Sequence, residues 1–165
     1  MTRFVRKILL VVVLASIVAL LLLPLFNNGL QYQHENSAGK HICTCALECM
    51  DGRTQLVVAD TAKKVASADL VDVITQAGIV RILAENRNQA LIENFKYELG
   101  ISVEKHGTKI VSIVAHEDCA GNPVSKEQQM HNLRQAKKTV ESWNMGVKVI
   151  MLWVEKPFNK AELVK

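Results

Sequence analysis

The chain has few aromatic residues and no stretch in which they alternate with basic ones. Its 165 residues include two Trp, two Tyr and four Phe. The net charge is +4, and Arg3, Arg6 and Lys7 near the N-terminus carry three of these units, so the rest of the chain is almost neutral. Nucleic-acid binding requires a concentrated basic surface, so the composition argues against DNA or RNA as a partner.

The four cysteines include no Cys-x-x-Cys pair, which disfavours a thiol-redox protein. Cys43 and Cys45 lie in a predicted strand, where burial as small apolar side chains is the expected role. In an oxidising setting they could instead pair, for example between subunits. A metal cluster that includes Cys43 and Cys49 is not expected, because six residues of strand separate them by roughly 20 Å.

Charged residues are absent from Ile8 to Phe26, an apolar run long enough to cross a bilayer as a helix. We predict a signal anchor or a signal peptide over residues 1–26, and the length of the run favours the anchor. The basic N-terminal flank places the following domain outside the cytoplasm, either periplasmic or extracellular. If the segment is cleaved, the domain is secreted. Residues 27–40 are polar and without periodicity, so they are predicted to form a tether.

The remaining residues, 41–165, alternate between segments rich in β-branched residues and helical segments. This pattern is typical of an α/β fold with a mainly parallel sheet flanked by helices. No internal repeat is apparent. Strands are predicted over about 42–49, 70–74, 109–115 and 147–154, and helices over about 55–66 and 84–105 and from Ser125 to Gly146.

Two short motifs carry the chemistry, and both fall at the C-terminal ends of predicted strands. One is Cys49-Met50-Asp51-Gly52-Arg53 and the other is His116-Glu117-Asp118-Cys119. Open α/β sheets bind their ligands at this edge. Thiolate and imidazole donors favour zinc, and three protein ligands leave a coordination position for water. We therefore predict Zn2+ bound by Cys49, His116 and Cys119.

Asp51 and Arg53 are the predicted catalytic pair beside this metal site. A carboxylate two residues from a ligand can accept a hydrogen bond from metal-bound water or become a fourth ligand. Arg53 can hold the carboxylate ionised and fix its direction. The alternative is structural, because Asp-Gly is a common turn dipeptide and Asp51 could simply cap the next helix.

The order Cys-x-Asp-x-Arg followed by His-x-x-Cys resembles the signature of the β-class carbonic anhydrases. Gln76-Ala77-Gly78 lies where that family carries an Ala-Gly turn, and the similarity extends over most of residues 42–154. The resemblance implies reversible hydration of carbon dioxide to bicarbonate by metal-bound hydroxide, with Asp51 and Arg53 as a dyad. It also implies a homodimer.

The chain departs from the family pattern at two positions within these motifs. Gly52 stands where the family usually has serine, and Ala120 where it usually has the first of two glycines. These departures leave two alternatives open: a non-catalytic zinc-binding domain of the same fold, or a hydrolase of another small molecule such as carbonyl sulfide or carbon disulfide. Four side chains are candidate proton relays, and the sequence selects none: His106, Glu117, Asp118 and His131.

Overall fold

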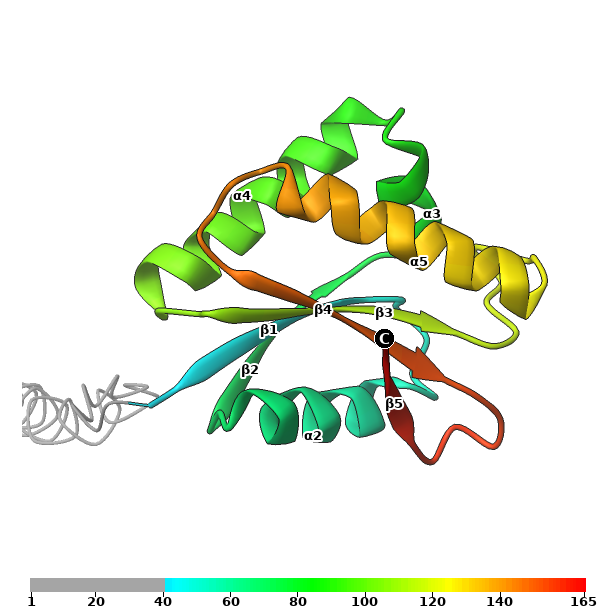
Figure 1. Ribbon diagram of the computed structural model, residues 1–165, viewed down its shortest axis with the longest axis horizontal. Helices are drawn as coiled ribbons and strands as arrows, with labels where there is room; N and C mark the ends of the chain where they lie inside the picture. Colours follow the sequence, from blue (N-terminus) through cyan, green and yellow to red (C-terminus); the bar gives the residue numbers. More distant parts are fainter. Residues whose placement is uncertain (1–40) are drawn as a thin grey trace, which may run out of the picture. The chain divides into compact units, whose positions relative to one another are not determined.

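The computed structural model describes residues 41–165 of the chain, and these form a five-stranded sheet with helices on both faces. The strands are β1 (Cys43–Glu48), β2 (Leu70–Thr75), β3 (Ile110–His116), β4 (Lys148–Val154) and β5 (Ala161–Val164). The helices are α2 (Gln55–Ala66), α3 (Ile79–Glu85), α4 (Gln89–Lys105) and α5 (Lys126–Glu141). Figure 1 shows α3, α4 and α5 on one side of the sheet and α2 on the other.

The sheet has the strand order β2-β1-β3-β4-β5. The first four strands are parallel, and only β5 runs antiparallel, against β4. The predicted α/β class with a mainly parallel sheet is therefore confirmed. Because β1 and β3 are neighbours, their C-terminal ends lie at the same edge of the sheet, and this adjacency positions the site.

Helices cover both faces because the central strands are apolar on both sides. The larger core lies between the sheet and α3, α4 and α5, and Phe95, Leu99 and Leu133 are fully buried in it. The smaller core lies on the α2 face and includes Ala46, Val58 and Val114 together with Leu152, Val154 and Ala161. The side chains alternate between the two cores along each strand, which fixes the register of β1 against β3.

Two features differ from the sequence prediction. The helix predicted over 84–105 begins later, as α4 at Gln89, where the Asn88 side chain caps it, and α3 over Ile79–Glu85 was not predicted; a left-handed conformation at Asn86 ends α3. Strand β5 was not predicted, because four residues with exposed charged neighbours give little periodic signal. The segment that leads into β5 nevertheless reaches the functional site.

The predicted membrane segment and tether, residues 1–40, lie outside the described residues. Among residues 41–165, no helix combines the length and apolar character that a membrane crossing needs.

Candidate metal centre

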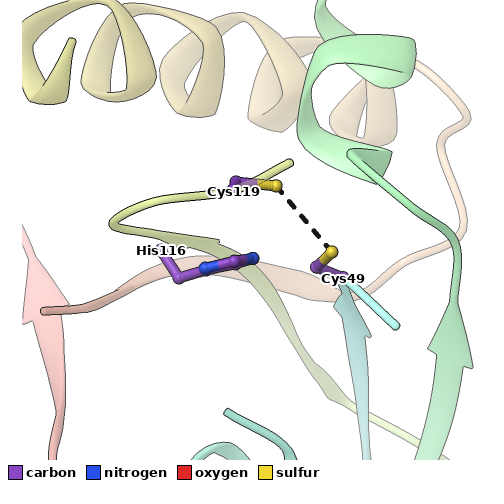
Figure 2. Close-up of side chains that lie close together, drawn as sticks. All are labelled: Cys49, His116 and Cys119. Carbon is purple, nitrogen blue, oxygen red and sulfur yellow. Dashed lines mark hydrogen bonds between the residues drawn. The ribbon is translucent and has the colours of Figure 1, made fainter. Parts of the chain in front are cut away.

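Three donor side chains meet at the C-terminal ends of β1 and β3. Cys49 directly follows β1, His116 is the last residue of β3, and Cys119 lies on the loop after it. Their donor atoms all lie within 4.8 Å of one another, and the two sulfur atoms are 3.8 Å apart. Figure 2 shows the three side chains pointing toward one another. The structure thus brings together the three residues predicted as ligands.

The one hydrogen bond of the His116 ring, made by Nδ1, leaves Nε2 free to face the two sulfur atoms. The Nδ1–H group donates to the Glu117 carbonyl oxygen at 2.8 Å, and a carbonyl can only accept, so Nδ1 carries a proton. The Nε2 atom is buried and has no hydrogen-bond partner in the described part of the chain. An orphaned imidazole nitrogen beside two thiols is the donor set that suits a zinc ion.

A small cavity lies at the three donors. Its volume is about 10 Å3, and Cys49, His116 and Cys119 all line it, together with apolar residues of α3 and β3 and the polar side chains of Asn122 and Gln129. Space of this size holds one water molecule or one small ion. The residues present therefore fit a single metal ion in both donor chemistry and size.

The two thiols share one hydrogen bond and have opposite pKa shifts. Cys119 donates to Cys49, which lowers the pKa of Cys49 and raises that of Cys119. Backbone N–H groups of Gly78 and Asp51 lower the pKa of Cys49 further. One thiolate is therefore already favoured at neutral pH, and binding of a cation would favour the second.

Two glycines allow the turn between β2 and α3 to approach the loop that carries Cys119. A Cβ atom at Gly78 would lie 2.3 Å from the Gly121 carbonyl oxygen, and a Cβ at Gly121 would lie 2.3 Å from the Gly78 nitrogen. Gly78 also has a φ of +63°, in the left-handed region that favours glycine. Gly52, in contrast, has open space around it, so serine would fit there. That departure from the family pattern is therefore sterically neutral.

Asp51 and Arg53 form the predicted pair at the edge of the site. Arg53 Nη2 donates to Asp51 Oδ2 at 2.6 Å and Nε donates to Oδ1 at 2.9 Å, which is a bidentate contact. These bonds hold the pKa of Asp51 at about 2, so the carboxylate is ionised. Asp51 does not cap α2 with its side chain, because Thr54 is the N-cap residue and no side-chain cap bond is present.

Arg53 has two further partners that sequence reasoning did not assign to it. Its Nη1 donates to Asp118 Oδ2 at 3.2 Å, and its guanidinium lies over the ring of Phe158, 4.4 Å from the centroid. Phe158 also meets the His116 ring edge-on, with centroids 6.5 Å apart. Phe158 carries no sequence signal, because its place beside the site depends on the fold of the segment before β5.

Glu48 is a second residue that sequence reasoning missed. It is the last residue of β1, its side chain is 1% exposed, and neither carboxylate oxygen has a hydrogen-bond partner in the described residues. Burial raises its pKa to about 7. The available signal was a single charged residue at the end of an otherwise apolar strand.

The remaining candidates lie elsewhere or have other partners. His106 Nδ1 contacts Asp72 Oδ2 at 2.7 Å on the β2 side of the sheet, and His131 is exposed on α5. Glu117 accepts a hydrogen bond from the Lys156 backbone N–H at 3.1 Å, so it ties two loops together. Cys45 is fully buried and Cys43 partly so, and both are free thiols.

Comparison with known proteins bears on the same region. The search of curated proteins found no match. Among solved structures, the fold is similar to β-carbonic anhydrase isoform I from Trichomonas vaginalis, with 14% identity and a TM-score of 0.51 over 99% of this chain and 97% of that one. A carbonic anhydrase from Glaciozyma antarctica is 16% identical, with a TM-score of 0.46 over 73% and 81% of the two chains.

The first of these likenesses shows a shared fold. A family model described as "Putative carbonic anhydrase" matches residues 39–164, which include both motifs and every described strand. The chain therefore belongs to this carbonic-anhydrase-like family, as a divergent member of the β class that its two motifs resemble.

Proposed function

We propose that this protein catalyses the reversible hydration of carbon dioxide to bicarbonate with one zinc ion per chain. The observation that carries the proposal is the buried Cys49, His116 and Cys119 cluster, whose donors lie within 4.8 Å and whose His116 Nε2 has no other partner. Three donors, rather than four, are the number expected of a catalytic zinc site.

Zinc, when bound, would lower the pKa of a water molecule toward neutrality and so supply a nucleophile at physiological pH. The chain's own residues hold the ion and set its charge. Two thiolates neutralise the 2+ charge, and His116 is kept in one tautomer by the Glu117 carbonyl. The low pKa of Cys49 keeps the first of these thiolates available at neutral pH.

Asp51 would act on the proton of the water. Its carboxylate stays ionised because Arg53 donates to both oxygens, so it can accept a hydrogen bond at neutral pH but cannot itself be a general acid there. An acceptor in a fixed position orients the attacking oxygen, and Arg53 supplies the fixed position. The side chain of Asp51 is 19% exposed, so solvent can reach the pair and receive the proton.

The test is stopped-flow hydration of carbon dioxide by the full-length chain, with metal analysis of the same sample. We expect one zinc ion per chain and a hydration rate that falls about tenfold to a hundredfold in Asp51→Asn, the scale of a lost positioning group beside a metal site. Asp60→Asn is the matched control, because Asp60 is an exposed aspartate on α2, outside the site. It should keep the parent rate.

Two results would replace this proposal. Stoichiometric zinc without hydration up to about pH 9, well above the roughly neutral pKa expected of zinc-bound water, would indicate a non-catalytic zinc-binding domain. Hydrolysis of carbonyl sulfide or carbon disulfide at rates far above that of carbon dioxide hydration would indicate a different small-molecule substrate. An unchanged rate in Asp51→Asn would remove the carboxylate from the mechanism.

We also propose that the activity operates outside the cytoplasm, on a chain held to the membrane by residues 8–26. This rests on the apolar run and its basic flank in the sequence. Mass measurement of the mature N-terminus would show whether the segment is retained. Protease protection in intact and broken cells would show on which side of the membrane the domain lies.

A further inference from the structure

Phe158 lies in the segment between β4 and β5. Its side chain contacts the metal-ligand cluster through His116 and the Asp51–Arg53 pair through Arg53. The Arg53 guanidinium lies over the face of its ring at 4.4 Å, and the His116 imidazole meets it at an interplanar angle of 68° with centroids 6.5 Å apart. Both geometries are attractive for an aromatic ring, since its face is negative and its edge positive.

The backbone of this segment is anchored independently of the ring. The Lys156 N–H donates to the Glu117 carboxylate at 3.1 Å, and the Phe158 N–H donates to the Glu155 carbonyl at 2.8 Å. On the far side, β5 pairs with β4 from Ala161 to Val164. These hydrogen bonds and the strand pairing therefore hold the backbone that carries the Phe158 ring.

The segment that carries Phe158 also contacts the loop that bears Cys119. Glu117 and Asp118 lie between His116 and Cys119, and the Lys156 ammonium is 3.6 Å from the Asp118 carboxylate. Asp118 in turn accepts from Arg53 at 3.2 Å. The segment thus contacts both the loop after β3 and the guanidinium that holds Asp51.

We propose that Phe158 is a positioning residue that holds Arg53 and His116 in their working orientations at once. The ring limits the rotation of the guanidinium, so Arg53 keeps its bidentate contact with Asp51, and it limits the rotation of the imidazole, so Nε2 keeps facing the two thiols. One aromatic side chain from the end of the chain thereby couples the metal ligands to the Asp51–Arg53 pair.

A plain packing role is the competing explanation, since Phe158 also lies against the smaller core on the α2 face. Substitutions separate the two explanations. Leucine and methionine keep most of the apolar volume but have no ring face, whereas tyrosine keeps the ring. All three meet the same backbone cost at the left-handed φ of 64°, so the comparison is matched.

The experiment compares full-length Phe158→Leu, Phe158→Met and Phe158→Tyr with the parent. The first readout needs neither metal nor activity: the Arg53 side-chain proton resonances in the metal-free protein, which a ring face at this distance shifts upfield. The second is the rate of zinc release to a chromophoric chelator. The third is carbon dioxide hydration, which rests on the proposed function.

We expect the upfield shift to disappear in the leucine and methionine variants and to persist in the tyrosine variant. Zinc release should be about threefold to fivefold faster without the ring, the scale of one edge-to-face aromatic contact, here the contact with His116. Hydration should fall by a similar factor in kcat/KM, and tyrosine should restore both rates. Far-UV circular dichroism checks that each variant is folded.

Unchanged zinc release in folded leucine and methionine variants would overturn the proposal, as would release in the tyrosine variant as fast as in leucine. If the leucine variant does not fold, the methionine and tyrosine pair decides in the same way. A parent protein that binds zinc without hydrating carbon dioxide would refute the proposed function alone, because the first two readouts would still test Phe158.

Discussion

The two halves of the site differ in burial, and this difference determines what each half depends on. Cys49, His116 and Cys119 are at most 6% exposed, whereas the side chains of Arg53 and Asp51 are 44% and 19% exposed. The buried donors are positioned by the backbone, through strand register and the approach of two loops. The exposed pair is positioned by side-chain contacts with water nearby. The first half should therefore respond to steric changes and the second to charge and pH.

The largest expected effect is the loss of a donor from the buried half. Zinc binding to structural sites contributes roughly 10–16 kcal/mol. If the ligands share this free energy, removal of one ligand costs about 3 kcal/mol or more, which is at least a hundredfold in affinity. We predict this loss for His116→Ala, measured by competition with a chelator. His131→Ala, at an exposed position on α5, is the matched control and should bind zinc like the parent. Equal affinities in both variants would remove His116 from the site.

The next largest effect is steric. It tests whether the close approach of the Gly78 and Gly121 backbones positions the three buried donor side chains. Gly78→Ala would place a Cβ 2.3 Å from the Gly121 carbonyl oxygen at a left-handed φ. We predict a loss of about 2–3 kcal/mol in the free energy of unfolding, measured in urea. Gly52→Ala is the matched control, because a Cβ there meets nothing within 4 Å. A Gly78→Ala variant as stable as the control would contradict the close approach.

The smallest effect concerns the exposed half and its pH dependence. Arg53 lowers the pKa of Asp51 from 3.8 to about 2, so the pair stabilises the folded state fully above about pH 4. Most of the contribution is lost as the pH falls from about 4 to about 2, and it is gone only below pH 2, where Asp51 is protonated in both states. We predict that Asp51→Asn is less stable than the parent at neutral pH and that the difference becomes small by pH 2.

A double-mutant cycle with Arg53→Gln isolates this pair. The coupling between Asp51 and Arg53, measured by urea unfolding, should be present at pH 7 and fall to a small fraction of that value by pH 2. A coupling that is constant across this range would show that the bond between the two residues does not depend on the charge of Asp51.

Much of the fold follows from local sequence pattern. The first four strands were predicted within about two residues of their ends, and for β3 and β4 the reason is that β-branched runs buried on both faces are hard to mistake. Helix α3 was not predicted, because its seven residues are too few to show a clear helical period, and the polar stretch from Glu85 to Gln89 did not reveal the two caps that separate α3 from α4. Strand β5 was missed because its pairing with β4, rather than its own four residues, makes it a strand.

The sequence by itself determined the chemistry of the site: which residues can bind a soft divalent metal, which carboxylate accompanies them, and that both motifs end parallel strands. Tertiary structure alone decided what surrounds them. Gly78 and Gly121 meet across 43 residues of chain, Arg53 reaches Asp118 across 65, and Phe158 joins them from beyond β4. The physical reason is that ligand identity is a property of side-chain atoms, whereas contacts between distant segments arise only when the sheet brings their ends together.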